Sequence, residues 1–194
     1  MRTLMRSLAL TLLAMGLLPS AAAQQAIFLV RHAEKIDESM NALDTPLSKP
    51  GKARARLLAD TLKDAGITAI YASPALRTQE TAAPLARVLG LEMKIIDQGN
   101  PRPLVERLRS RNSKDVVLIV GHSNTLPDIL SELGHTPRVK IRSEEYSNLF
   151  VVIPRGDKPP SVLRLRFGED LGENSARRKS PPPPRSKSSP AGQP

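Results

Sequence analysis

The stretch that decides the fold runs from Val116 to His122 and reads VVLIVGH. Its first five residues are Leu or β-branched, which is the composition of a strand buried on both faces. A second stretch, AIFLV at 26–30, is also an uninterrupted apolar run, and Arg31 and His32 follow it. We therefore expect two buried strands of a helix-covered sheet, each followed by a histidine at its carboxyl end.

Outward from these two strands, helical and strand patterns alternate along the chain. Ser48 is a helix cap and Gly66 closes that helix, while Ser73 and Pro74 predict the cap and first residue of another helix that stops at Gly90. The predicted elements after 26–30 are a helix at 48–65, a strand at 67–72, a helix at 74–89, a strand at 93–96, a helix at 103–111, the strand at 116–120, a helix at 126–133, and a closing strand pair at 150–153 and 162–165. This order predicts an α/β fold, a three-layer sandwich with a mainly parallel sheet and helices on both faces.

The first 23 residues have the layout of a secretory signal peptide. Arg2 and Arg6 form a positive head, an apolar run follows at 8–18, and the three alanines at 21–23 match a cleavage site. The run is far shorter than the roughly 20 apolar residues of a membrane-spanning helix, which argues against an anchor. We expect cleavage near Ala23 and a protein that is periplasmic or secreted.

The segment at 173–194 predicts a disordered, Pro-rich basic tail, and the folded domain is expected at 25–170. The tail contains RRKSPPPPRSKSSPAGQP and no large apolar residue that could offset the entropy of ordering it. The two terminal segments hold seven of the 29 basic residues, which leaves 22 to set against 19 acidic residues. The net charge of +10 therefore does not indicate a nucleic-acid partner. The tail is interpreted as a solvated segment without a role, and the alternative is a weak contact with an anionic envelope surface or a proline-reading partner.

Four basic side chains follow strands of the predicted sheet, where ligands of open α/β sheets bind. Arg31 and His32 follow the first strand, Arg77 lies in the first turn of a predicted helix, and His122 follows the strand at 116–120. Each one alone has an ordinary explanation as a loop residue or a solvated charge. Together they form a dense positive cluster that an anion would stabilise, and Arg offers planar paired donors to phosphate oxygens. The chain has no Cys, which excludes Cys nucleophiles and thiolate metal sites.

Three segments match, in order, the motifs of one enzyme family: FLVRHAE at 28–34, YASPALRTQETA at 71–82 and VGHSNT at 120–125. They resemble the histidine phosphatase superfamily, also called phosphoglycerate mutase-like, and the resemblance covers roughly residues 26–167. Ala33 stands where the first motif of the family usually has Gly. The resemblance implies the phosphoglycerate mutase-like fold and a small member of the family.

The resemblance also implies a mechanism. His32 would attack phosphorus to form a phosphohistidine, which water would then hydrolyse. Arg31, Arg77 and His122 would bind the phosphoryl oxygens and stabilise the charge of the transition state. No metal and no cofactor is implied. The residues themselves agree, because the attacking nitrogen of His32 must be neutral and the neighbouring cations favour that state.

The group that protonates the leaving oxygen is left open. In many members a carboxylate after the third strand has this role, so Asp97 is the first candidate, with Glu34 and Glu106 as alternatives. Another branch of the family places Asp directly after the second histidine, where this chain has Ser123. Asn124 is either an additional phosphate ligand or a helix cap. An active site without an acid would suit good leaving groups, as in phosphohistidine or phosphoramidates.

The sequence therefore predicts a phosphatase that acts on a phosphate ester or phosphoramidate, such as a phosphorylated envelope sugar or small metabolite. Mutase activity is disfavoured, because the segment between Arg77 and His122 is short and export separates the protein from glycolysis. A catalytically inactive phosphate-binding or scaffold protein of the same fold is the alternative. A metal hydrolase that uses His32 and His122 is disfavoured, because the sequence shows no compact set of further ligands.

Overall fold

A computed structural model of the protein describes residues 26–37, 39, 42–110 and 115–168. These residues fall within the domain predicted at 25–170. The predicted signal peptide at 1–23 and the predicted tail at 173–194 lie outside them. Within the described ranges, no helix is long and apolar enough to cross a membrane.

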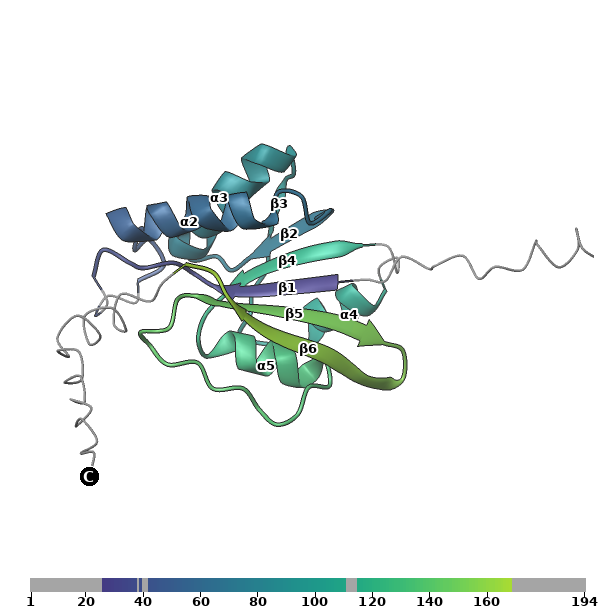
Figure 1. Ribbon diagram of the computed structural model, residues 1–194. Helices are drawn as coiled ribbons and strands as arrows, with labels where there is room; N and C mark the ends of the chain where they lie inside the picture. The colour runs from purple at the N-terminus through teal and green to yellow at the C-terminus, as the bar shows by residue number, and fades with distance from the viewer. Residues whose placement is uncertain (1–25, 38, 40–41, 111–114, 169–194) are drawn as a thin grey trace, which may run out of the picture.

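A six-stranded mixed sheet forms the middle layer of the fold (Figure 1). In chain order the strands are β1 (Ala26–Arg31), β2 (Ala69–Ala72), β3 (Met93–Ile95), β4 (Val116–Gly121), β5 (Asn148–Arg155) and β6 (Lys158–Arg166). Their order across the sheet is β3-β2-β4-β1-β5-β6. The four strands β3, β2, β4 and β1 run parallel, and β5 pairs antiparallel with both β1 and β6. The two apolar runs that decide the fold are thus neighbours at the centre of the sheet.

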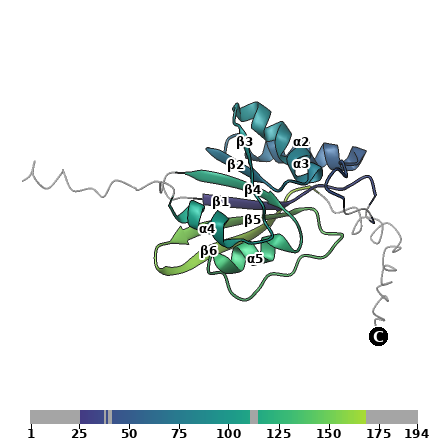
Figure 2. The same ribbon diagram turned by 180° about the vertical axis from the view of Figure 1, so that it is seen from behind.

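Helices cover both faces of the sheet, as the sequence predicts. They are α2 (Lys49–Leu62), α3 (Leu76–Leu89), α4 (Arg102–Arg109) and α5 (Thr125–Glu132). The helices α2 and α3 lie on one face, and α4 and α5 lie on the other (Figures 1 and 2). The predicted α/β three-layer fold with a mainly parallel sheet is confirmed.

Alternate residues of the central strands pack into two separate apolar layers. Leu29 of β1 and Ile119 of β4 pack with the side chains of α4 and α5. Their neighbours Val30 and Val120 pack on the opposite face, with α2 and α3. Successive side chains of a strand point to opposite faces, so a strand covered on both sides must be apolar throughout. This explains the uninterrupted apolar runs in the sequence.

Two of the predicted helix ends are confirmed and one helix start is wrong. Ser48 caps α2, because its hydroxyl accepts from the Gly51 N–H at 3.2 Å, and Gly90 ends α3 in a left-handed conformation with φ of 65°. The helix predicted to begin at Ser73 and Pro74 instead begins at Leu76. The N-cap residue of this helix is Ala75 rather than Ser73, and the Ser73 hydroxyl lies 2.8 Å from Nε2 of His122.

Candidate active site

Two histidines lie side by side where β1 and β4 end. The register pairs Arg31 with Gly121, and the His32 N–H extends this pairing by donating to the Gly121 carbonyl at 2.9 Å. His122 follows Gly121 in the chain, so the parallel register brings both rings to one edge, with their centroids 5.3 Å apart. A Cβ at Gly121 would lie 2.5 Å from Oε1 of the buried Gln98, which explains why a glycine precedes His122.

His32 is buried, with 4% of its surface exposed, and its ring is held in one tautomer. Its Nδ1 lies 2.8 Å from the Ala33 carbonyl oxygen. A carbonyl only accepts, so the proton of the neutral ring is on Nδ1 and Nε2 carries the lone pair. Burial, followed by the charges of Arg31, His122 and Arg77, lowers the pKa of His32 to about 2, although the Ala33 contact opposes this. His32 is therefore neutral at physiological pH, as a nucleophile requires.

The guanidinium of Arg31 is held in a fixed orientation at the end of β1. Its Nη1 donates to the Ser143 carbonyl and lies 3.4 Å from the carbonyls of both Arg142 and Glu145. It stacks on the Tyr146 ring at 3.9 Å, and Nη2 lies 3.2 Å from the Tyr146 hydroxyl. The buried Nε has no hydrogen-bond partner among the described residues. One donor of an otherwise fixed guanidinium thus remains for a bound acceptor.

Arg77 and His122 complete the cluster from the other side. Arg77 is the second residue of α3, is buried, and donates from Nη1 to the Ala42 carbonyl at 2.9 Å. Burial, followed by the charges of Arg77, Arg31 and Lys35, lowers the pKa of His122 to about 4. The structure thus brings together the four residues that the sequence predicts at this edge of the sheet.

Lys35 is a site residue that the sequence analysis missed. Its side chain is 7% exposed, and its charge is one of the three that lower the pKa of His122. The residue pairs with Leu47 in an isolated β-bridge just after β1. Its position three residues after His32 is only a weak signal in the sequence, because Glu34 is nearer to His32 along the chain and pairs with Arg54 instead.

Tyr146 and Glu145 are further residues that the sequence analysis missed. Tyr146 is buried, and its ring meets that of His32 edge-on with centroids 6.0 Å apart. Glu145 forms ion pairs with Arg164 and Arg166 of β6, at 3.4 and 3.1 Å. The signal available was topological: β5 is antiparallel to β1, so the residues just before β5 lie at the edge where β1 ends.

The structure does not bring the three predicted acid candidates to the histidine pair through any contact among the described residues. Asp97 is exposed on the loop after the edge strand β3, and its carboxylate accepts from the Gly99 N–H at 2.9 Å. Glu34 is buried in an ion pair with Arg54, with an N–O distance of 2.7 Å. Glu106 is exposed on α4. The general acid therefore stays a prediction.

Gln98, rather than Asp97, turns inward from the loop after β3. It is 2% exposed, and its amide donates to the Val120 carbonyl at 3.0 Å and accepts from Thr125 Oγ1 at 3.3 Å. Asn124 is exposed at the N-cap position of α5 and makes no side-chain capping hydrogen bond. Its predicted role as a phosphate ligand remains a prediction.

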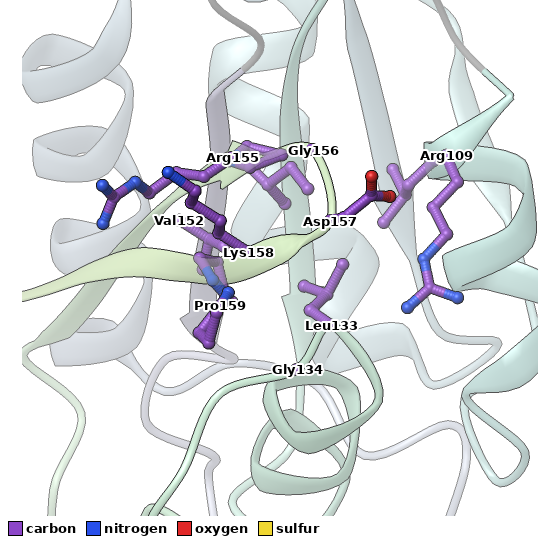
Figure 3. Close-up of a pocket in the computed structure, with 13 residues that line it drawn as sticks. Arg109, Leu133, Gly134, Val152, Arg155, Gly156, Asp157, Lys158 and Pro159 are labelled. Carbon is purple, nitrogen blue, oxygen red and sulfur yellow. The ribbon is translucent and has the colours of Figure 1, made fainter.

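A cavity of about 660 Å³ lies at the other edge of the sheet, beside the start of β1. The β5–β6 hairpin and the ends of α4 and α5 line it, and Figure 3 shows Arg155, Asp157 and Lys158 of the hairpin with Arg109 of α4. It is separate from the histidine pair, because Val152 of β5 pairs with Ile27 at the start of β1. Among the described residues, no group of three or more His, Asp or Glu could hold a metal ion.

Comparison with known proteins places the chain in a family. Residues 27–98 match the family model described as the histidine phosphatase superfamily, branch 1. The "Probable phosphoglycerate mutase GpmB" of Yersinia enterocolitica is 37% identical over 161 residues, which cover 75% of this chain and 71% of that protein. The chain belongs to the histidine phosphatase superfamily. A second member, "Phosphoserine phosphatase 1" of Hydrogenobacter thermophilus, is 39% identical over 71 residues, and the chain spans only 34% of its length.

Solved structures of other proteins share the fold. A protein histidine phosphatase SixA complexed with tungstate has a TM-score of 0.61 at 20% identity, over 73% of this chain and 96% of that one. A mycobacterial glucosyl-3-phosphoglycerate phosphatase has a TM-score of 0.59 at 16% identity, over 73% and 97% of the two chains. At these sequence identities the likeness shows only that the fold is shared.

Proposed function

We propose that the protein is a phosphatase that hydrolyses a phosphate ester or phosphoramidate through a phosphohistidine on His32. The observation that supports this most directly is the neutral His32 ring, whose Nδ1 proton is engaged by the Ala33 carbonyl at 2.8 Å. The Nε2 lone pair is then the nucleophile. Burial, together with the neighbouring cations Arg31 and Arg77, lowers the pKa of the His32 ring and keeps this lone pair free. A phosphate-bearing substrate also fits the names of the relatives, which are phosphatases and a mutase.

The reaction would proceed in two displacements. In the first, Nε2 of His32 forms a bond to phosphorus while the bond to the leaving oxygen or nitrogen breaks, and the leaving group takes that electron pair and a proton. In the second, water attacks phosphorus, the N–P bond breaks, and Nε2 recovers its lone pair while inorganic phosphate leaves. Arg31, Arg77 and His122 would stabilise the equatorial oxygens during both steps.

The charges at the site favour an anionic substrate. Arg31, Lys35 and Arg77 are all buried, and the charges of all three act on His122, so an anion bound at the site would be attracted by all of them. The Arg31 Nε, which has no partner among the described residues, would gain one from a phosphoryl oxygen. Arg pairs planar donors with phosphate oxygens, so a tetrahedral oxyanion matches the cluster in charge and in geometry.

The leaving group is the open part of the chemistry. The side chains whose charges act on the pKa values of His32 and His122 are all basic: Arg31, Lys35, Arg77 and, for His32, also His122. This favours substrates whose leaving group needs no proton from the protein, such as phosphoramidates. Asp97→Asn distinguishes the alternatives: a selective loss of turnover with an alkyl phosphate, but not with p-nitrophenyl phosphate, would identify Asp97 as the acid.

The test is phosphate release by the purified protein from p-nitrophenyl phosphate, an alkyl phosphate and a phosphoramidate. We expect turnover by the wild type, none by His32→Ala, and unchanged turnover by the matched control His135→Ala. His135 is the third histidine of the chain, and its backbone N–H ends α5 by donating to the Leu130 carbonyl. Unchanged turnover in His32→Ala would end the assignment of His32. Phosphate binding without turnover by the wild type would support a non-catalytic phosphate-binding protein instead.

We also propose that the protein is exported and cleaved near Ala23. The support is the sequence of the first 23 residues, with its positive head, apolar run and small residues. Cell fractionation and N-terminal sequencing test this: an envelope or medium fraction whose chain begins near Gln24 is expected. A cytoplasmic protein that retains the first residues would contradict it.

A further inference from the structure

Two buried hydroxyl groups connect His122 to the start of α3. Ser73 Oγ lies 2.8 Å from His122 Nε2 and 2.9 Å from Thr78 Oγ1. Thr78 Oγ1 in turn lies 2.6 Å from the Ala75 carbonyl oxygen and 3.0 Å from that of Ser73. Ser73 is 4% exposed and Thr78 is fully buried, so these contacts are protected from water.

The distances in this hydrogen-bond network favour one arrangement of its protons. Thr78 has one hydroxyl proton, and its shortest contact with an acceptor is 2.6 Å to the Ala75 carbonyl oxygen, so we assign the proton to that carbonyl. With the proton there, Thr78 Oγ1 accepts from Ser73 at 2.9 Å, which uses the one hydroxyl proton of Ser73. The Ser73 oxygen, which also accepts from the Ala75 N–H at 3.3 Å, can therefore meet His122 Nε2 only as an acceptor.

We propose that Ser73 and Thr78 are positioning residues that hold the neutral ring of His122 with its proton on Nε2. His32 has the opposite tautomer, with its proton on Nδ1 against the Ala33 carbonyl, although the two ring centroids are only 5.3 Å apart. The proton assignment for His122 rests on the directions assigned to the hydrogen bonds of Ser73 and Thr78, and it does not depend on the proposed phosphatase function. Its catalytic consequence rests on the proposed phosphatase function.

The consequence concerns how His122 meets a phosphoryl group. With Nε2 engaged by Ser73, Nδ1 is the ring nitrogen left for a phosphoryl oxygen, and in the neutral ring Nδ1 carries a lone pair rather than a proton. His122 can therefore donate to the anion only after Nδ1 has taken up a second proton. The charges that oppose this proton are those of Arg77 of α3, Arg31 of β1 and Lys35 after β1, and the neutral ring of His32 faces His122 at a centroid distance of 5.3 Å. A bound dianion offsets their charge, so phosphate binding is coupled to protonation of His122.

Nitrogen NMR of the full-length, ¹⁵N-labelled protein tests this in the absence of substrate. The chain has only three histidines, so the ring signals are assigned with His135→Ala and His122→Gln. We expect His122 to be protonated at Nε2 and His32 at Nδ1 near neutral pH, and inorganic phosphate to protonate His122 at both nitrogens. A wild-type His122 protonated at Nδ1 alone would overturn the proposal. If the NMR signals show the expected tautomers but the protein has no turnover, the phosphatase function is refuted and the proton assignment still holds.

Variants separate positioning from a merely structural role. Thr78→Val removes the acceptor of the Ser73 proton, so Ser73 can donate to His122, and we expect the ring to shift toward the Nδ1-protonated tautomer. Ser73→Ala should lower kcat about tenfold with little change in KM, and Ser73→Thr should restore most of it, since one hydrogen bond is lost and regained. Ser131→Ala is the matched control, because the Ser131 hydroxyl donates only to Pro127 within α5 at 2.9 Å. An unchanged His122 signal in folded Thr78→Val would contradict the proposal.

Discussion

The most informative single perturbation is at Tyr146, because this side chain fixes Arg31 and contacts His32. Its ring lies 3.9 Å below the Arg31 guanidinium, its hydroxyl lies 3.2 Å from Arg31 Nη2, and its centroid is 6.0 Å from that of His32. Tyr146→Phe removes only the hydroxyl, whereas Tyr146→Leu also removes the aromatic face. The two variants therefore separate the hydrogen bond from the stacking.

The structure sets the size of the two effects. A hydrogen bond to a charged group contributes about 1.5–3 kcal/mol, and the carbonyls that also hold Arg31 favour the lower end, so Tyr146→Phe should lower kcat/KM about tenfold. Stacking of a desolvated guanidinium adds about 2 kcal/mol, so Tyr146→Leu should lower kcat/KM by a further factor of about 30. Because Arg31 would bind phosphate before and during the reaction, the inhibition constant of inorganic phosphate should rise in parallel.

The assay is kcat/KM with p-nitrophenyl phosphate together with inhibition by inorganic phosphate, after urea unfolding has shown that each variant is folded. Tyr71→Phe is the matched control, because Tyr71 is the other of the two tyrosines in the chain and is fully buried in β2. It should leave the phosphate inhibition constant unchanged. A folded Tyr146→Leu within twofold of the wild type in both quantities would refute the assigned role.

Three further predictions follow from other parts of the structure. Arg54→Met leaves the buried carboxylate of Glu34 without its ion-pair partner and should lower the free energy of unfolding, measured in urea, by about 3–5 kcal/mol. The control Arg138→Ala breaks an exposed pair with Asp128 and should change this free energy by less than about 1 kcal/mol. Equal effects of the two variants would contradict the prediction. Arg77→Gln should raise the inhibition constant of inorganic phosphate about 30-fold or more, since a charge-assisted contact is lost, and a change below threefold would remove Arg77 from the site. Acid should destabilise the fold. Below pH 6.5 both histidine rings are protonated in the unfolded chain, whereas in the folded chain the pKa is about 2 for His32 and about 4 for His122. Unfolding therefore takes up protons, and the free energy of unfolding falls as the pH falls. Each ring contributes at most about 1.4 kcal/mol per pH unit, and a double His32→Gln, His122→Gln variant with the same pH slope as the wild type would contradict the burial of both rings.

The sequence predicts the four basic site residues because each is tied to a local pattern. Arg31 and His32 follow one apolar run, His122 follows another, and Arg77 lies in the first turn after a third strand. Carboxyl ends of parallel strands meet at one edge, so the patterns alone bring these side chains together. The alternation of strands and helices predicts the three layers for the same reason.

The remaining site residues depend on contacts that no local pattern encodes. Ser73 is a reasonable helix cap by position, but its partner His122 is 49 residues away in the sequence. Tyr146 lies in a segment without helical or strand periodicity, and its place beside Arg31 follows only from the antiparallel pairing of β5 with β1.

The inward-facing residue after β3 is a similar case. The sequence favours the ionisable Asp97, whereas the fold buries its neighbour Gln98 against the Val120 carbonyl. A loop that turns by one residue exchanges the inward and outward side chains, and the sequence holds no signal for that turn. The sequence thus predicts the basic cluster that the structure shows, whereas no contact in the structure supports Asp97 as the acid.

The central claim is that His32 Nε2 accepts the phosphoryl group, and trapping the intermediate tests it most directly. Wild-type protein mixed with a ³²P-labelled phosphate ester or phosphoramidate and quenched within milliseconds should carry a label on His32 that is stable in base and lost in acid. The predicted result is labelling of the wild type and of His135→Ala, and none of His32→Ala. Turnover by the wild type with no acid-labile label at any quench time, or an equal label on His32→Ala, would contradict the account.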